Sequence, residues 1–327
     1  MLYMFRILLP SLLLAVCACG STSGKQASVS AEENAETTSV PTLAFSGDSA
    51  LALVSRQVEF GPRVPGSEAH ARTAAWIQQR LEESGVTTTV QRTTLTAFDG
   101  TKLPVSNILA SINPDAERRW LIVAHWDTRP WSDKDADSSR RLNPVDGAND
   151  GASGVGILLE LARVLPASLP ADRGVDLLFV DAEDWGDEGS EESWAMGTRY
   201  FIQNPPQEWR RPEAGIVVDM VGDRDATFMR EYFSEQAAPE LNARIWGTAA
   251  SLGYGERFLN RMGTAVTDDH VELIRGGIPA IDIIDFRDNG AQSGFCPQWH
   301  TSDDTMRHIS PATLESVGRT LESFLTR

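Results

Sequence analysis

Cysteine is scarce in this 327-residue chain, which contains only three such residues. Two of them, Cys17 and Cys19, lie together in the N-terminal segment, so we expect no disulfide framework in the folded part. The third, Cys296, lies alone near His300. Two interpretations of Cys296 stay open: a soft metal ligand, or a small buried apolar residue, which is the commoner role of a single cysteine.

Basic residues are also few, with 29 Lys and Arg against 46 Asp and Glu and a net charge of −17. Such a surface repels nucleic acid and anionic lipid headgroups, so we expect no nucleic-acid partner. A solvated acidic surface is the simplest explanation of the imbalance. The apolar fraction, 41%, is ordinary for a globular protein and allows a sizeable core.

Long hydrophobic runs are lacking too. The apolar stretch Ile7–Val16 follows Arg6, contains Pro10 and is too short to span a bilayer comfortably. This pattern is typical of a secretory signal. The segment Val16–Gly20 resembles a bacterial lipobox, which favours Cys19 as the lipidated residue because a small residue precedes it. A cleaved signal without a lipid anchor is the alternative.

The composition divides the chain into three expected parts. These are a lipoprotein signal peptide at 1–19, a flexible tether at 20–46 and one folded domain at 47–327. The tether is rich in Ser, Thr, Ala and Glu and has no apolar period. We therefore expect a protein that is exported to the bacterial cell envelope and anchored to a membrane by its lipid. A monomer is expected as well, although no sequence feature decides the oligomeric state.

Within the body, short apolar runs alternate with helical patterns. Apolar spacing predicts helices at 69–84, 151–165, 195–203, 237–252, 269–275 and 311–325, the second of them ended by Pro166. Strands are expected at 86–95, 106–112, 120–124, 175–180, 215–221 and 278–284. Continuous apolar strands alternating with helices predict an α/β fold, a three-layer αβα sandwich around a mixed sheet that is parallel in its centre.

An adjacent acid pair, Glu183 and Asp184, follows the apolar run 175–180. Neighbouring residues at the tip of a buried strand point in different directions. One carboxylate can then hold a metal while the other faces a substrate as a proton carrier. Carboxylates and imidazoles at the carboxyl ends of parallel strands are how such a sheet builds a catalytic zinc site. A solvated turn is the alternative.

Other expected strand ends and loops carry the same residue types: His125, Asp127, Asp150, Asp219, Asp268 and His300. An Asp two residues after a metal-binding His is typical of a brace behind the imidazole. Asp150 precedes a helix, so it is either a metal ligand or a helix cap. A carboxylate such as Asp219 at the end of a buried strand is costly unless it is paired. Asp269 is expected to cap the next helix, which leaves Asp268 for the site.

The joint order of these residues, ending in Trp-His-Thr, resembles that of the zinc-aminopeptidase-like superfamily. Within it, the chain most resembles the animal-type glutaminyl-peptide cyclotransferases. The similarity covers nearly the whole body and is carried by Gly61–Ser67, Ser106–Ile108, His125–Asp127, Asp181–Asp184, Asp268–His270, Gly276–Pro279 and Trp299–Thr301. The Asp-Asp-His element and the Trp before the last His are similar to the cyclases specifically.

This resemblance implies a zinc-dependent acyltransferase that converts an N-terminal Gln of peptides or proteins to pyroglutamate and releases ammonia. It implies a single zinc ion with an open fourth position, held by Asp150, Asp184 and His300. Animal cyclases carry Glu where Asp184 stands, so the shorter side chain requires a closer backbone. Glu183 would be the general acid and base, with Asp219 and Asp268 in a hydrogen-bonded network beside it.

The substrate pocket is expected to have Trp299 as a wall. Animal cyclases carry a second Trp in the loop after the acid pair, where this chain has Gly189. Trp185 or Trp194 would take its place.

Two competing functions remain. In a two-zinc aminopeptidase, His125 and Asp219 would form a second metal site with Asp150 as the bridge, and Glu183 would activate a water molecule. Alternatively, a non-catalytic lipoprotein would use the same fold to bind peptides.

Overall fold

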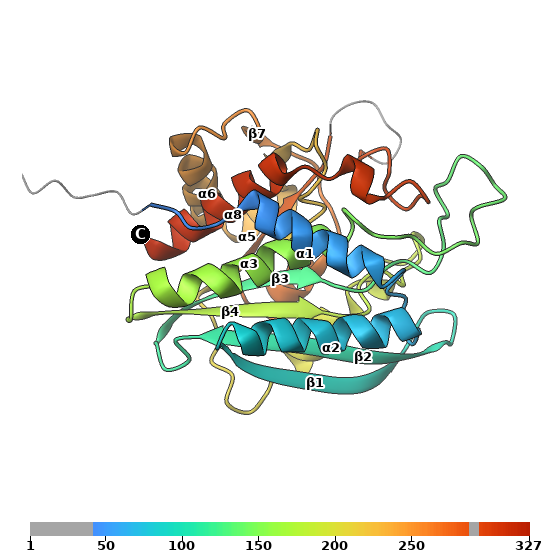
Figure 1. Cartoon of the computed structure of the whole chain (residues 1–327), viewed down its shortest axis with the longest axis horizontal. Helices are drawn as coiled ribbons and strands as arrows, with labels where there is room; N and C mark the ends of the chain where they lie inside the picture. The colour runs from blue at the N-terminus through green and yellow to red at the C-terminus, as the bar shows by residue number, and fades with distance from the viewer. Residues whose placement is uncertain (1–41, 288–293) are drawn as a thin grey trace, which may run out of the picture. The chain divides into compact units, whose positions relative to one another are not determined.

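Six strands form the central sheet of the computed structural model, which describes residues 42–287 and 294–327 (Figure 1). Their spatial order is β1-β2-β4-β3-β5-β8. Strands β4, β3, β5 and β8 are parallel, whereas β1 and β2 form an antiparallel edge. The bounds are Thr87–Thr96 (β1), Lys102–Ile112 (β2), Arg118–His125 (β3), Arg173–Val180 (β4), Ala214–Asp219 (β5) and Ala280–Ile284 (β8). The predicted mixed sheet with a parallel centre is confirmed.

Alternate residues of β3 pack into two different apolar clusters. Ile122 and Ala124 belong to a large core, and Leu121 and Val123 to a smaller one on the other face of the sheet. All four side chains are fully buried. A strand that is buried on both faces has no polar alternation, which is why the apolar run identified it.

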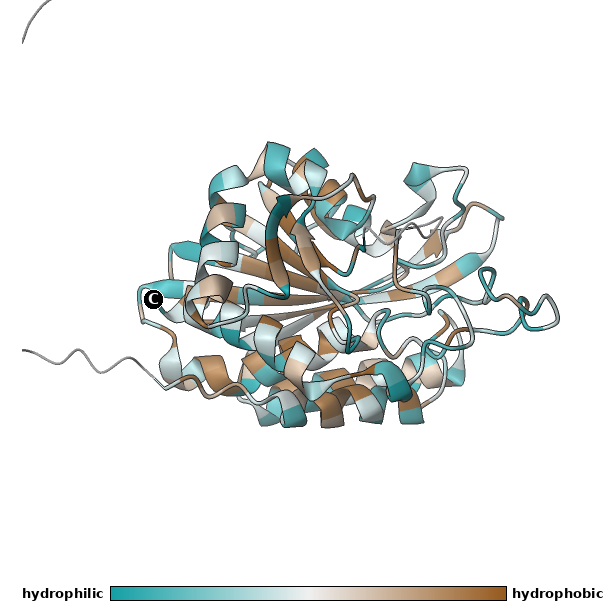
Figure 2. Cartoon of the chain, turned by 90° about the horizontal axis from the view of Figure 1, so that it is seen from above, coloured by the Kyte–Doolittle hydropathy of each residue, from teal (hydrophilic) through white to brown (hydrophobic). Residues whose placement is uncertain are grey.

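Helices cover both faces, so the brown apolar strands in Figure 2 lie between two helical layers. The large core contains side chains of α1 (Gly47–Glu59), α2 (Glu68–Glu83), α3 (Ala152–Ser168), α6 (Pro239–Ser251) and α8 (Pro311–Thr326). The smaller core contains side chains of α4 (Met196–Gln203) and α7 (Asp269–Arg275). The short helix α5 (Tyr232–Ala237) contacts β8, and β6 (Phe228–Arg230) and β7 (Phe258–Met262) form a separate parallel pair. The three layers are those that the sequence predicted.

Two helix predictions need correction. Pro166 does not end α3; it lies in the last turn, where its missing N–H removes a single donor, and the helix continues to Ser168. The helix expected at 237–252 is divided, because α5 ends at Ala237 and Pro239 begins α6. A proline in the first turn of a helix loses no intrahelical bond, so it favours a new start.

The expected tether extends too far into the body. Phe45 is buried, and the N–H groups of Ala44 and Phe45 donate to the Glu322 carboxylate at 2.8 and 2.9 Å. Ser46 caps α1 by accepting from the N–H of Ser49. Residues 44–46 therefore belong to the folded unit, which spans Thr42–Arg327.

The expected signal peptide, the lipidation site Cys19 and the tether up to residue 41 lie outside the described residues. Among the described helices, none combines the length and the apolar character needed to cross a membrane.

Candidate metal centre

Three loops bring Asp150, Asp184 and His300 together. One ligand atom of each lies within 4.8 Å of the others, and all three residues are buried. The Nε2 atom of His300 is 3.2 Å from Oδ1 of Asp184 and 3.7 Å from Oδ2 of Asp150. The three residues that the resemblance implied as ligands therefore converge.

The donor set fits a divalent metal. Two carboxylates and one imidazole are ligands that zinc accepts, and three protein ligands leave a position for a substrate. Oδ1 of Asp184 is buried and accepts no hydrogen bond from the described residues, although Nη1 of Arg129 lies 3.5 Å from it. A buried carboxylate oxygen without a hydrogen bond is stabilised by a nearby cation, and a bound metal would supply that charge at closer range. Gly151, not Asp150, occupies the N-cap position of α3, so the alternative role of Asp150 as a cap is wrong.

Asp127 fixes the backbone of the acid pair. Its Oδ1 and Oδ2 accept hydrogen bonds from the N–H groups of Glu183 and Asp184 at 3.1 and 3.2 Å. The expected brace on His125 is longer, with 3.6 Å between Nδ1 of His125 and Oδ1 of Asp127, which is beyond hydrogen-bond range. Asp127 therefore positions the acid pair more directly than it positions the imidazole.

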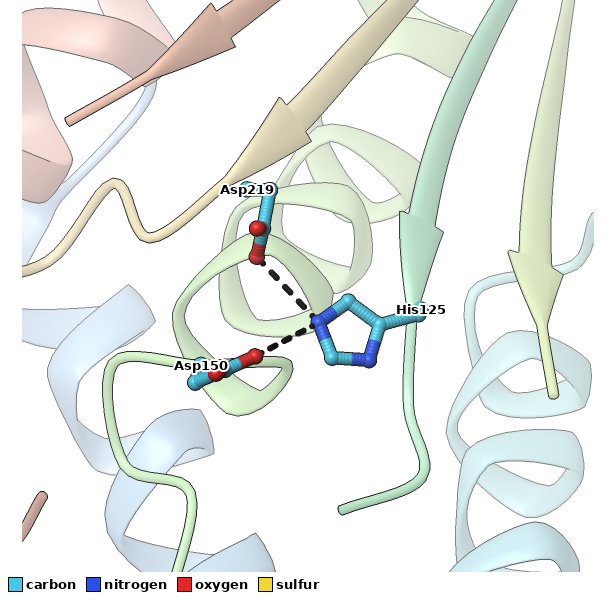
Figure 3. A group of neighbouring side chains, drawn as sticks. All are labelled: His125, Asp150 and Asp219. Carbon is cyan, nitrogen blue, oxygen red and sulfur yellow. Dashed lines mark hydrogen bonds and ion pairs between the residues drawn. The ribbon is translucent and has the colours of Figure 1, made fainter. Parts of the chain in front are cut away.

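A second group meets on the other side of Asp150. Figure 3 shows Nε2 of His125 facing Oδ1 of Asp150 at 3.0 Å and Oδ1 of Asp219 at 3.2 Å. Burial lowers the pKa of His125, but the carboxylates of Asp127, Asp150 and Asp219 outweigh burial and raise it well above its usual value. This group is the one that a two-metal site would use, with Asp150 as the bridge.

Burial raises the pKa of Glu183 well above its usual range, and the charges of Asp184 and Asp268 add to this effect while His125 opposes it. Burial, together with Asp150 and Asp268, raises the pKa of Asp219 to about 7 against the opposing effect of His125. Asp219 can therefore carry a proton near neutral pH in the metal-free protein, and the neutral form of Glu183 is favoured for the same physical reason.

Asp268 and Asp269 have the reverse of their expected roles at the helix terminus. Asp268 is the N-cap of α7 and accepts from the N–H of Asp269, whereas Asp269 lies in the first turn, fully buried. The position of Asp268 still suits the site, because its side chain lines the same cavity as Glu183.

A cavity of about 360 Å³ opens beside the metal-ligand group. Its lining includes Asp150, Glu183, Trp194, Asp219, Met220, Val266, Asp268, Ile284, Trp299 and His300. The rings of Trp299 and Trp194 are stacked with the His300 ring, with centroid separations of 3.8 and 5.8 Å. The pocket therefore has an acidic end at the ligand group and an aromatic wall.

Trp185 lies outside this cavity. It packs against Ala97 and Leu103, contacts Trp131 edge-on, and donates from Nε1 to Asp99 at 3.3 Å. Of the two tryptophans that the sequence left open, Trp194 is the one in the pocket.

Residues 107–325 match the model of peptidase family M28. The chain belongs to peptidase family M28. Its structure is similar to Porphyromonas gingivalis glutaminyl cyclase (46% identity, TM-score 0.84, covering 86% of this chain and 98% of that one). It is also similar to a leucine aminopeptidase precursor from Bacteroides thetaiotaomicron (41% identity, TM-score 0.84, covering 88% and 99%). The glutaminyl-peptide cyclotransferase of Bos taurus is 25% identical over 252 residues, 67% of this chain and 65% of that protein.

Backbone strain in this M28 chain gathers at the candidate site. Ala182, Met220 and His300 have φ values of +53, +47 and +54°. Two of them flank Glu183 and Asp219, and the third is a candidate ligand. Left-handed backbone is costly for such residues and persists only where the surroundings hold it. The strained backbone at these positions therefore sets the direction in which the neighbouring side chains enter the site.

Sequence analysis missed a third buried group behind Asp268. Nε2 of His270 is 3.0 Å from Oε2 of Glu231, and Nδ1 is 3.6 Å from Oδ2 of Asp282. Asp282 was visible as a single acid within the apolar run 278–284, and only the fold shows that it faces Asp268. Cys296 is buried against Met220 and Val266 and belongs to none of these groups, which agrees with its apolar interpretation.

Proposed function

We propose that this chain is a glutaminyl-peptide cyclotransferase, which converts an N-terminal Gln of a peptide to pyroglutamate and releases ammonia. One observation carries the proposal: Glu183 lines an aromatic-walled pocket next to the group of Asp150, Asp184 and His300. A buried acid beside an electrophile-binding site is what an intramolecular amide displacement needs. The similarity to bacterial glutaminyl cyclases supports the same activity.

Asp150, Asp184 and His300 would hold a zinc ion, and its chemistry when bound is the polarisation of the amide oxygen of the Gln side chain. Trp194 and Trp299 would confine that side chain against the ligand group. This arrangement would hold the substrate's own α-amine close to its side-chain carbonyl carbon, and that orientation lowers the activation barrier. The aromatic wall would also keep bulk water away from the reacting groups.

Glu183 would transfer the protons. The α-amine attacks the side-chain amide carbon, and a new C–N bond closes a five-membered ring. Glu183 takes the proton that the amine loses and returns one to the amide nitrogen, which leaves as ammonia when its C–N bond breaks. The raised pKa of Glu183 fits a group that must be neutral for part of the cycle, since burial and the charges of Asp184 and Asp268 favour its protonated form.

The decisive experiment is an assay with a Gln-starting dipeptide, in which ammonia and the product are both measured. We expect ammonia and the pyroglutamyl dipeptide in equal amounts. Release of a free amino acid without ammonia would contradict the cyclase and favour a two-zinc aminopeptidase. The group of His125, Asp150 and Asp219 is the observation that favours this second function.

We also propose export and lipid anchoring through Cys19, because the N-terminal segment combines a signal pattern with a lipobox-like one. We further propose that the protein acts as a monomer on peptides or proteins that begin with Gln. Labelling of cells with a fatty-acid analogue tests the anchor. The full-length protein should carry the label, and a Cys19→Ser variant should not.

A further inference from the structure

Asp304 joins two loops that are far apart in the sequence. It lies four residues after His300 in the sequence and is buried, with 1% of its surface exposed. Its Oδ1 accepts from the N–H of Asn149 at 2.8 Å, and its Oδ2 accepts from the N–H of Asp150 at 3.0 Å. Its backbone carbonyl accepts from the N–H of Ala148 at 3.3 Å. A single residue next to one candidate ligand thus binds the backbone of another.

We propose that Asp304 is a positioning residue, which fixes the backbone of Asp150 relative to His300 and so preorganises two metal ligands before the metal binds. The inference rests on the proposed metal site and adds a residue that is not itself a ligand. Residues outside the ligand set that orient the ligands commonly change metal affinity when they are replaced.

The local backbone explains why a carboxylate is needed there. Asn149 and Asp150 precede Gly151, the N-cap of α3, so their N–H groups take no part in the hydrogen bonds of that helix. Each buried N–H group left without an acceptor destabilises the folded state. A carboxylate presents two oxygens to two successive N–H groups, whereas an amide presents one oxygen and turns its NH₂ group toward the other donor.

A buried arginine also binds the backbone of this segment. Arg63 is fully buried and donates from Nη2 to the carbonyl of Gly147 at 2.6 Å and from Nη1 to the carbonyl of Asp146. Gly147 has φ +63°, and a Cβ atom there would lie 2.4 Å from Thr128. The segment 146–150 is therefore held through its carbonyls by Arg63 and through its N–H groups by Asp304.

The backbone of His300 is strained, and Asp304 lies in the same loop. His300 has φ +54°, a conformation that the surrounding structure must hold in place. The loop from His300 to Asp304 is closed by hydrogen bonds from the N–H of Thr301 to Gln298 and from the N–H of Asp304 to Thr301. Because Asp304 ties this loop to Asp150, loosening the tie should displace both ligands together.

The test compares Asp304→Asn with Asp303→Asn, a matched control at a half-buried neighbour that binds Arg307 and His308 instead. The zinc dissociation constant of each full-length protein is measured by competition with a chelator. We expect Asp304→Asn to raise it about 10- to 100-fold and Asp303→Asn to leave it within about threefold. A value within threefold of the unsubstituted protein for a folded Asp304→Asn protein would overturn the inference.

Two further measurements separate the possible outcomes. If Asp304→Asn does not fold, Asp304→Ser, which retains one acceptor, is measured against the same criterion. A purely structural role would lower the unfolding temperature of the zinc-free protein without changing the added stabilisation by zinc, and that result also overturns the inference. The unsubstituted protein is also assayed with a Gln-starting dipeptide. If Asp304→Asn weakens zinc binding as expected but the unsubstituted protein releases no ammonia, the proposed function fails and the positioning role stands.

Discussion

The Nε2 atom of His125 lies 3.0 Å from Oδ1 of Asp150, while the other oxygen of that carboxylate faces His300. Asp150 therefore lies between two imidazoles, and it contacts each through a different oxygen. In a one-metal enzyme, His125 would donate a hydrogen bond from Nε2 to Asp150 and orient it as a ligand. In a two-metal enzyme, the same atoms bind a second ion and Asp150 bridges the pair.

Zinc content distinguishes these two cases. For the cyclase we expect a single zinc ion per chain, retained in His125→Ala and lost in His300→Ala, because only the second substitution removes a ligand. Metal analysis after exhaustive dialysis checks this expectation. Two zinc ions per chain, falling to one in His125→Ala, would establish the aminopeptidase arrangement instead.

Replacement of Glu183 separates proton transfer from metal binding. Glu183→Gln keeps the size of the side chain and removes its ability to take a proton. We expect zinc to stay bound and kcat to fall about 10²- to 10⁴-fold, the usual contribution of a general acid or base. Glu192→Gln, at an exposed acid of the same loop, serves as the control and should retain full activity. Activity of Glu183→Gln near that of the control would remove Glu183 from the mechanism.

The charge of Asp268 should shift the pH dependence of catalysis. Its negative charge raises the pKa of Glu183, so Asp268→Asn should lower that pKa and move the acidic limb of kcat/KM to lower pH. The sign holds with zinc bound, since removal of a nearby negative charge always favours ionisation of Glu183. Asn is also a good N-cap, so the start of α7 should persist. An acidic limb of kcat/KM that stays at the same pH or moves to higher pH would contradict this electrostatic coupling. Glu240→Gln, which removes an exposed negative charge, serves as the control and should leave the limb unchanged.

The sheet and the ligands were predictable because each depends on a short stretch of sequence. An apolar run as short as 175–180 favours a strand covered on both faces, and the placement of the acid pair at its end follows from that strand. Helix α1 was missed because its buried face mixes the apolar Ala50 and Val54 with the polar Gln57. Gln57 donates to the carbonyl of Ala152 on α3, a contact that no periodicity reveals.

The details of the site depend on directions that only the fold sets. Sequence could not show that Asp127 accepts from the backbone of the acid pair, because the register of β3 against β4 brings them together. Nor could it choose between two neighbouring tryptophans: Trp194 enters the pocket, whereas Trp185 packs near the turn between β1 and β2. Residue type gave the chemistry of the site, and tertiary contacts gave its geometry.

These two tryptophan positions also allow a controlled test of the pocket. Trp299→Ala removes the ring that is stacked on His300, so we expect kcat/KM for Gln-starting peptides to fall about ten- to hundredfold, in line with about 1.5–3 kcal/mol for a buried apolar side chain. Trp185→Ala removes a similar area outside the cavity and should lower the unfolding temperature while KM stays near its original value. Equal effects of both substitutions on KM would show that the pocket is not where the substrate binds.

The position of Phe45 makes the beginning of the folded unit testable through stability. Its ring packs so closely on α8 that a Cβ atom at Gly318 would lie 2.1 Å from it, and Glu322 accepts the N–H groups of Ala44 and Phe45. Truncation of a buried Phe to Ala costs about 3–5 kcal/mol, so Phe45→Ala should lower the free energy of unfolding by that amount.

A chain beginning at Thr42 should unfold like the longer protein, whereas one beginning at Gly47 should be destabilised at least as much as Phe45→Ala, because it also loses both bonds to Glu322. Denaturant titration of the four proteins measures these differences. Equal stability of the chains that begin at Thr42 and Gly47 would return residues 42–46 to the tether.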